Sequence, residues 1–218
     1  MKLFIDSADV SEIRRLAQSG LVDGVTTNPS LIAKSGGDIA ETIAEICSIV
    51  PGPISAEVLS IDYEIMVTEG RKLAKIADNV VVKLPLTWDG LRACKVLSDE
   101  GTQVNVTVCF SAAQAMLAAK AGATFVSPFV GRLNDIGSEG MELIDDICTI
   151  FSQYPEFETE VLVASVRQVS QVVDAGRMGA HAATLPPKIF EGMFMHPLTD
   201  KAIKTFVEDA EKSGQKIL

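Results

Sequence analysis

Short β-rich runs alternate with longer amphipathic runs from one end of the chain to the other. The β-rich runs predict strands at residues 3–5, 24–26, 54–58, 80–84, 104–108, 124–127, 161–164 and 182–185. A stretch with helical spacing follows each of them. Eight such units are the number expected for a closed (β/α)₈ barrel, and 218 residues is close to the lower limit of about 200 for that fold. We therefore predict an α/β protein, a single TIM-barrel domain over residues 1–218.

Local signals support this alternation of strands and helices. Asp9 is placed to cap a helix with Glu12 in capping-box spacing, and Gly20 ends that run. Two later units resemble each other, because each begins a helix with Ser and has Gln three residues later: Ser111 to Gln114, and Ser165 to Gln168. The competing architecture is an open doubly wound sheet, but no Gly-x-Gly-x-x-Gly or P-loop motif follows any predicted strand. This absence favours the barrel.

Composition and charge narrow the possible functions. The chain is 47% hydrophobic and has a formal net charge of −10, which suits one large core and argues against a nucleic-acid-binding surface. Its 4 cysteines show no Cys-x-x-Cys spacing, so neither a disulfide framework nor a zinc site is indicated. The histidines, His181 and His196, have no partner at metal-ligand spacing. We predict neither a catalytic metal nor a cofactor.

The sequence gives no sign of a membrane or secretory destination. The first residues enter a strand pattern directly, without the features of a signal peptide, and no segment approaches the roughly 20 apolar residues that a membrane span needs. We therefore expect a cytoplasmic protein without a membrane partner.

Lys83 lies in a run that otherwise reads as a strand buried on both faces. Val80, Val81 and Val82 precede it and Leu84 follows it. An unpaired ammonium group in such a place would cost several kcal/mol, so the side chain must either reach a carboxylate or give up its proton. The second outcome produces a nucleophile. A snorkelling or salt-bridged lysine is the competing structural interpretation.

Polar residues collect where the predicted strands end, which is where TIM barrels build their active sites. They come from seven strands or the residues just after them: Asp6, Thr26, Thr27, Asn28, Glu57, Lys83, Asn105, Thr107, Ser127, Arg132, Ser165 and Arg167. Taken alone, Asn28 reads as a turn residue before Pro29, and Glu57 as a strand-end carboxylate facing water. Together, Asp6, Glu57 and Lys83 supply the acid, base and nucleophile that carbonyl condensation requires.

A phosphate site is predicted at the corner after the seventh strand. Arg167 is expected in the first turn of the following helix, where free N–H groups and the helix dipole favour an anion. Arg132 adds a second guanidinium group and Ser165 adds a hydroxyl donor. These groups indicate a phosphorylated substrate.

Five ordered motifs resemble the transaldolase family, in particular its short, fructose-6-phosphate aldolase-like members. They are GVTTNPS (24–30), VVKLP (81–85), NVT (105–107), SPFVGR (127–132) and ASVR (164–167). The resemblance runs from the first strand to the last. It implies a (β/α)₈ barrel in which Lys83 forms a Schiff base, Asp6 is the acid/base, and Glu57 and Thr107 hold a catalytic water. It also implies sugar contacts from Thr26, Asn28, Asn105 and Ser127, and phosphate contacts from Arg132, Ser165 and Arg167.

The activity that the resemblance implies is transfer of a dihydroxyacetone unit from a ketose phosphate to an aldose phosphate, in the pentose phosphate pathway. The nearest alternative is a fructose-6-phosphate aldolase that releases free dihydroxyacetone. Those relatives carry Tyr where this chain has Phe129 and Gln where it has Glu57, so both positions favour transfer. An alternative of another class is a non-catalytic sugar-phosphate-binding barrel.

The C-terminal amphipathic run, about residues 198–212, has two interpretations. It is either the last barrel helix packed on its own core, or a contact with another subunit. Short members of the family form pentamer-based assemblies. The resemblance therefore implies a homo-oligomer, a pentamer or a decamer.

Overall fold

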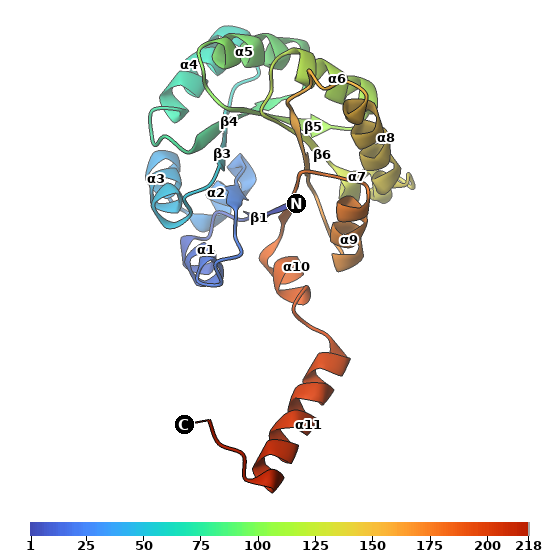
Figure 1. Cartoon of the computed structure of the whole chain (residues 1–218). Coiled ribbons are helices and arrows are strands. Elements are labelled where there is room, and N and C mark those ends of the chain that lie inside the picture. Colours follow the sequence, from blue (N-terminus) through green and yellow to red (C-terminus); the bar gives the residue numbers. More distant parts are fainter. Residues whose placement is uncertain (218) are drawn as a thin grey trace.

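A computed structural model describes residues 1–217 and shows a closed barrel of eight parallel strands in sequential order (Figure 1). The predicted (β/α)₈ fold is confirmed, and no predicted strand boundary is wrong by more than one residue. The strands are β1 (Lys2–Asp6), β2 (Gly24–Thr26), β3 (Ile54–Glu57), β4 (Val80–Pro85), β5 (Val104–Cys109), β6 (Phe125–Pro128), β7 (Glu160–Val163) and β8 (Ala182–Leu185).

All helices except the last surround the barrel, and three of the strands are each followed by two helices. They are α1 (Val10–Ala17), α2 (Pro29–Ser35), α3 (Ile39–Ile49), α4 (Tyr63–Leu73), α5 (Trp88–Asp99), α6 (Ala112–Lys120), α7 (Val130–Asp135), α8 (Gly140–Ser152), α9 (Val169–Arg177), α10 (Pro187–Gly192) and α11 (Pro197–Ser213). The pairs α2–α3, α7–α8 and α10–α11 each follow a single strand. The shorter α2 and α7 begin directly after the mouth residues of β2 and β6.

Side chains alternate between two faces along each strand, and this alternation explains why a lysine lies within the apolar run of β4. On β4, Val82 and Leu84 belong to the large core between the barrel and its helices. Val81 belongs instead to a small separate cluster, and Lys83 follows it on the same inner face. The apolar run of β4 therefore packs on both faces of the strand, and its inner position at Lys83 opens into the barrel interior.

The small inner cluster forms the floor of the barrel. Its members are Phe4, Val81, Phe125, Leu162 and Ala182, one from each of five strands. The rings of Phe4 and Phe125 meet edge to face, with centroids 5.8 Å apart. Gly24 makes room for them, because a Cβ there would lie 2.7 Å from the Phe4 ring. Side chains two residues further along each strand stand on this apolar floor.

Two of the predicted helix starts are confirmed and one is wrong. Asp9 accepts the N–H of Glu12 at 3.1 Å, and Ser111 accepts the N–H of Gln114 at 3.2 Å. The unit that begins at Ser165 behaves differently. There α9 starts only at Val169, with Gln168 as the cap and Gln171 completing the capping box.

The physical reason for this late start is the backbone at Ser165. Its φ of 60° is left-handed, which turns the chain away from the helical path. Arg167 consequently lies before α9 and not in its first turn. The prediction that the N–H groups of a helix N-terminus lie beside Arg167 is therefore also wrong. The side-chain oxygen of Gln171 accepts the Arg167 N–H at 2.8 Å and holds this loop against α9.

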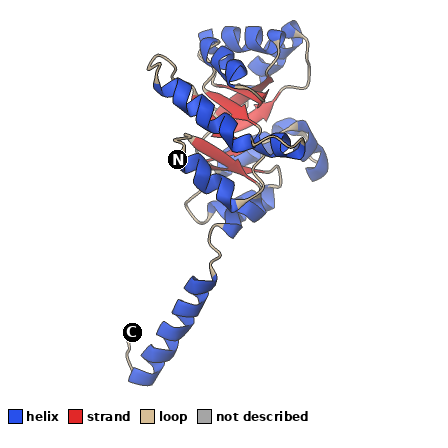
Figure 2. Cartoon of the chain, turned by 90° about the vertical axis from the view of Figure 1, so that its right-hand side faces the viewer, coloured by secondary structure: helices blue, strands red, loops and turns tan. Residues whose placement is uncertain are grey.

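The C-terminal helix α11 extends away from the barrel, as both views show (Figures 1 and 2). None of its residues is buried, and the helix that packs on β8 and α9 is α10. The interpretation of residues 198–212 as a helix packed on its own core is therefore wrong. Within residues 1–217, no helix is long and apolar enough to cross a membrane.

Candidate active site

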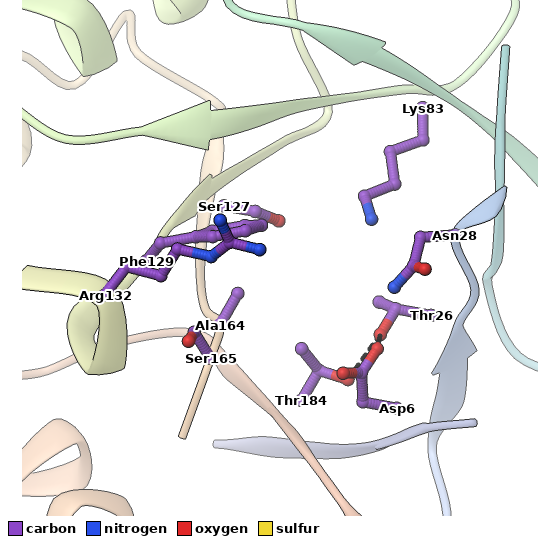
Figure 3. A pocket seen from close by; sticks show the side chains of 10 residues that line it. All are labelled: Asp6, Thr26, Asn28, Lys83, Ser127, Phe129, Arg132, Ala164, Ser165 and Thr184. Carbon is purple, nitrogen blue, oxygen red and sulfur yellow. Dashed lines mark hydrogen bonds between the residues drawn. The ribbon is translucent and has the colours of Figure 1, made fainter. Parts of the chain in front are cut away.

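One cavity opens at the carboxyl ends of the strands, and it gathers most of the predicted site residues (Figure 3). It has a volume of about 140 Å³ and is open to solvent at its mouth. Five of its lining residues, one per strand, stand two positions after the five floor residues. The lining comprises Asp6, Thr26, Asn28, Lys83, Ser127, Phe129, Arg132, Ala164, Ser165 and Thr184.

Lys83 points into this cavity from β4 and is 5% exposed. Its Nζ lies 3.0 Å from Glu57 Oε2, and it donates to the backbone carbonyl of Thr27 at 3.1 Å. The side chain of Glu57 is only 17% exposed, so this is a largely buried ion pair. Of the two outcomes predicted for Lys83, the structure shows the paired one. The pairing partner is the carboxylate that comes from the adjacent strand β3.

Asp6 lies across the cavity from Lys83, on β1. Its Oδ1 accepts the hydroxyl of Thr26 at 2.7 Å, and the Thr26 oxygen lies 2.6 Å from the hydroxyl oxygen of Thr184. Burial raises the pKa of Asp6 above its ordinary value, while the Thr26 hydrogen bond and the charge of Lys83 partly oppose that rise. A carboxylate so placed takes up a proton more readily than an exposed one.

Polar side chains from β3, β5 and β6 form a network beneath the cavity. The amide of Asn105 donates to Ser55 Oγ at 3.1 Å, and its carbonyl oxygen accepts from Ser127 Oγ at 2.8 Å. Asn105 is fully buried, and Ser127 is the member of the network that reaches the cavity. Asn105 therefore orients Ser127 rather than lining the wall itself.

Thr107, which is on the same strand as Asn105, does not join this network. Its hydroxyl is fully buried and has no hydrogen-bond partner among residues 1–217. Buried hydroxyls are almost always paired, and leaving one unpaired costs about 1–3 kcal/mol. The next residue, Val108, has a left-handed φ of 62° and marks a shift in the pairing of β5 with β6. An unpaired hydroxyl beside a strained backbone is typical of a functional position.

Phe129 closes one side of the cavity. Its ring meets Phe110 edge to face at 5.9 Å, and the guanidinium group of Arg132 lies 5.9 Å from its centroid. Figure 3 shows Arg132 beside Phe129, with Ser165 below them. This side of the cavity thus combines an apolar wall with a cation and a hydroxyl.

Arg167 does not line the cavity. Its guanidinium group forms a bidentate contact with the Asp135 carboxylate on α7, and both side chains are about half exposed. The pKa of Asp135 is lowered by the hydrogen bonds from Arg167 and also by the charge of Arg132. The two arginines therefore flank one carboxylate at the rim. Gly131 allows α7 to approach Ser165 and Arg167 closely, because a Cβ there would lie 2.2 Å from the Ser165 carbonyl oxygen and 2.8 Å from Arg167 Nε.

The resemblance implies eleven site residues, and Phe129 makes twelve; eight of these twelve line the cavity and four surround it. Of these four, Glu57 forms an ion pair with Lys83. Asn105 and Thr107 are buried beneath the cavity wall, and Arg167 lies at the rim. Asn28 has two structural roles: it lines the cavity, and its side chain caps α2 by accepting the N–H of Leu31. Thr184 was not predicted. The available signal was a polar residue in an otherwise apolar strand, two positions after the floor residue Ala182.

The whole chain is similar to proteins of one family. Residues 3–217 match the sequence profile described as Transaldolase/Fructose-6-phosphate aldolase. A protein of Parvibaculum lavamentivorans named "Probable transaldolase" is 61% identical over 218 residues, which cover 100% of both chains. A protein of Rhodospirillum centenum with the same name is 59% identical, covering 100% of this chain and 94% of its own.

A solved structure adds information on the fold alone. Thiamine phosphate pyrophosphorylase from Pyrococcus furiosus superposes with a TM-score of 0.58 at 13% identity, covering 85% of each chain. The full-length match and the high identities are decisive. The chain is an enzyme of the transaldolase/fructose-6-phosphate aldolase family.

Proposed function

We propose that this enzyme transfers a dihydroxyacetone unit from a ketose phosphate to an aldose phosphate through a Schiff base on Lys83. The donor would be sedoheptulose 7-phosphate or fructose 6-phosphate, and the acceptor glyceraldehyde 3-phosphate or erythrose 4-phosphate. The observation that carries this proposal is the buried amine of Lys83, which faces a cavity and has a carboxylate partner at 3.0 Å.

Schiff-base formation begins with loss of a proton from Lys83. Within residues 1–217, Glu57 is the carboxylate in ion-pair contact with Nζ, so it is the group placed to accept that proton. The free amine then attacks the ketone carbon, and loss of water from the carbinolamine gives an iminium ion. The iminium withdraws electrons from the neighbouring carbon–carbon bond. Nothing else is needed as an electron sink.

Asp6 would manage the proton during cleavage and transfer. It takes the proton of the hydroxyl on the far side of the breaking bond, the aldose phosphate leaves, and the three-carbon unit stays on Lys83 as an enamine. The enamine carbon then attacks the acceptor aldehyde, and Asp6 returns the proton to the new alkoxide. Its raised pKa supports this exchange, because proton uptake by a buried carboxylate is favoured.

Hydrolysis of the iminium requires a water molecule that is held in place. We assign this role to Glu57 and Thr107. The unpaired, buried hydroxyl of Thr107 supports the assignment, because a bound water would satisfy it. The sugar hydroxyls would contact Thr26, Asn28 and Ser127 on the cavity wall, with Asn105 orienting Ser127 from beneath.

The substrate phosphate would bind at the rim, between Arg132 and Ser165. Both line the cavity on the side opposite Lys83. Arg167 would join them by exchanging its exposed contact with Asp135 for the phosphate oxygens, which suit a bidentate guanidinium group. Exposed ion pairs contribute only about 0–1 kcal/mol, so this exchange is inexpensive.

The second candidate function is an aldolase that releases free dihydroxyacetone, which the family name also includes. Phe129 argues for transfer, because a phenyl ring neither donates nor accepts a proton and keeps its side of the cavity dry. We expect the variant Phe129→Tyr to gain release activity at the expense of transfer. An unchanged ratio of transfer to release would remove this role from Phe129.

A two-substrate assay tests the proposed function. Fructose 6-phosphate is supplied with or without erythrose 4-phosphate, and the products are separated by mass spectrometry. Transfer predicts sedoheptulose 7-phosphate and little free dihydroxyacetone. Release of dihydroxyacetone that does not depend on the acceptor would favour the aldolase, and no turnover of either kind would favour a binding protein.

We also propose that the protein is a homo-oligomer in which α11 contacts another subunit. The helix exposes four apolar side chains, each 53–70% accessible: Leu198, Ile203, Phe206 and Val207. A helix with such a face needs a partner surface. Light scattering that detects only monomers would refute this.

A further inference from the structure

Three side chains from neighbouring strands form a short chain of hydrogen bonds at the cavity wall (Figure 3). Asp6 on β1 is joined to Thr26 on β2, and Thr26 is joined to Thr184 on β8. The two oxygen–oxygen distances are 2.7 Å and 2.6 Å. Thr26 and Thr184 are 2% and 3% exposed, so their hydroxyls have few alternative partners.

The direction of these hydrogen bonds follows from the charge on Asp6. A hydroxyl has one proton to donate, and an ionised carboxylate can only accept. When Asp6 is ionised, Thr26 must therefore donate to it, and in the second contact Thr184 must donate to Thr26. When Asp6 holds a proton, the reverse order becomes available, with Asp6 donating to Thr26 and Thr26 donating to Thr184.

We infer that Thr184 is a positioning residue for the reaction, because it orients the Thr26 hydroxyl toward Asp6. The direction of both hydrogen bonds reverses each time Asp6 takes up a proton and is restored when Asp6 returns it. This inference rests on the proposed role of Asp6. Donation from Thr184 polarises the Thr26 hydroxyl and strengthens its bond to the carboxylate, because hydrogen bonds in a chain reinforce one another. Thr184 thus stabilises the ionised form of Asp6, which is the form that accepts the substrate proton.

Other buried threonines show what a purely structural hydroxyl does. Thr27 donates to the backbone carbonyl of Ser55 at 2.8 Å, and Thr159 donates to that of Ala123 at 2.6 Å. A carbonyl oxygen cannot donate, so the direction of these bonds is fixed. The contact between Thr26 and Thr184 joins two groups that can each donate or accept, and it ends on a titratable group inside the cavity. Only such a chain can follow a change in protonation.

The charged groups that face Asp6 come from other elements and are separate from Thr184. Lys83 on β4 and Arg132 on α7 line the same cavity, and Glu57 on β3 pairs with Lys83. A variant at Thr184 leaves all three in place. A change in the pH dependence of catalysis can then be assigned to the hydroxyl chain.

The experiment measures kcat/KM for transfer as a function of pH in the wild-type enzyme and in Thr184→Val. Loss of the donor raises the pKa of Asp6, so the acid limb of the profile should move to higher pH by roughly 0.5 unit, or about threefold in rate on that limb. Thr184→Ser keeps the hydroxyl and should restore the wild-type limb. Thr159→Val is the matched control, since it removes a buried hydroxyl far from Asp6 and should not move the limb.

A double variant separates action through Thr26 from a direct effect. In a Thr26→Val background, the added change at Thr184 should cause no further shift, because the connection to Asp6 is already broken. Thermal unfolding verifies that each variant is folded, and Thr184→Ala replaces Thr184→Val if the latter is not. An active wild type whose acid limb is unmoved by the Thr184 variant overturns the inference alone. A wild type without transfer activity overturns the proposed function, and with it any role for Thr184 in proton transfer.

Discussion

The buried pair of Lys83 and Glu57 gives a quantitative prediction about stability. We consider Glu57→Gln, which removes the negative charge and keeps the shape of the side chain. At 3.0 Å the pair attracts by about 5 kcal/mol for an effective dielectric constant of about 20, and desolvation of both groups offsets much of this. Removing one partner from a buried pair typically costs about 3–5 kcal/mol, because the other charge remains uncompensated.

The two partners are not equally buried, so the two single variants should differ. Lys83 is the more enclosed, with its side chain 6% exposed against 17% for Glu57. Glu57→Gln strands the enclosed ammonium and should cost about 3 kcal/mol. Lys83→Met leaves a carboxylate that water partly reaches and should cost only about 1 kcal/mol. The double variant replaces the pair with neutral groups and should unfold within about 1 kcal/mol of the wild type.

Urea unfolding at pH 7 and one fixed protein concentration measures all four proteins, and the double-mutant cycle gives the coupling energy. We expect a coupling of about 3–5 kcal/mol. A coupling below about 0.5 kcal/mol, typical of an exposed pair, would show that the lysine is not enclosed beside Glu57 as described.

Three further changes test other parts of the site. Because burial raises the pKa of Asp6, its neutral form favours folding below the pKa of the unfolded chain, and this contribution is lost as the pH rises through the folded pKa. Asp6→Asn should therefore be inactive yet about 1 kcal/mol more stable than the wild type at pH 7, with the gap closing toward about pH 4 in a urea series; a less stable variant would contradict this. Gly131→Ala places a Cβ 2.2 Å from the Ser165 carbonyl oxygen. In initial-rate measurements it should raise KM for phosphorylated substrates about tenfold, with less effect on kcat. A tenfold fall in kcat as well would show that the phosphate does not bind beside Arg132 and Ser165. Burial raises the pKa of the Cys94 thiol to about 12, so native protein should react with iodoacetamide at this residue roughly 100-fold more slowly than unfolded protein, as peptide mapping would show.

The sequence predicted the barrel because the periodicity signal is strong and repeated. Eight apolar runs separated by amphipathic stretches leave few alternatives, and polar residues at strand ends locate the mouth. Period alone did not reveal which residues of β4 face inward, because Val81 and Val82 are chemically alike. Only closure of the barrel separates them into an inner and an outer core.

The errors concern interactions that no local pattern encodes. Ser165 matched a capping motif, but its left-handed backbone, stabilised by contacts between α7 and the end of β7, moved the helix start to Val169. Arg167 was predicted to bind phosphate from the first turn of a helix, but it lies before α9 and pairs with Asp135, which is 32 positions away in the sequence. Thr184 was missed because a lone threonine in a strand is ordinary, and its contact with Thr26 arises only when β8 closes beside β1.

The proposed reaction requires the Lys83 amine to form a covalent imine with a keto sugar. The direct measurement is borohydride reduction of the protein in the presence of fructose 6-phosphate, followed by peptide mass mapping, with Lys83→Met as the control. We expect a stable three-carbon adduct on the peptide that contains Lys83 and none on the variant. An unmodified Lys83, or an adduct that persists in the variant, would contradict it.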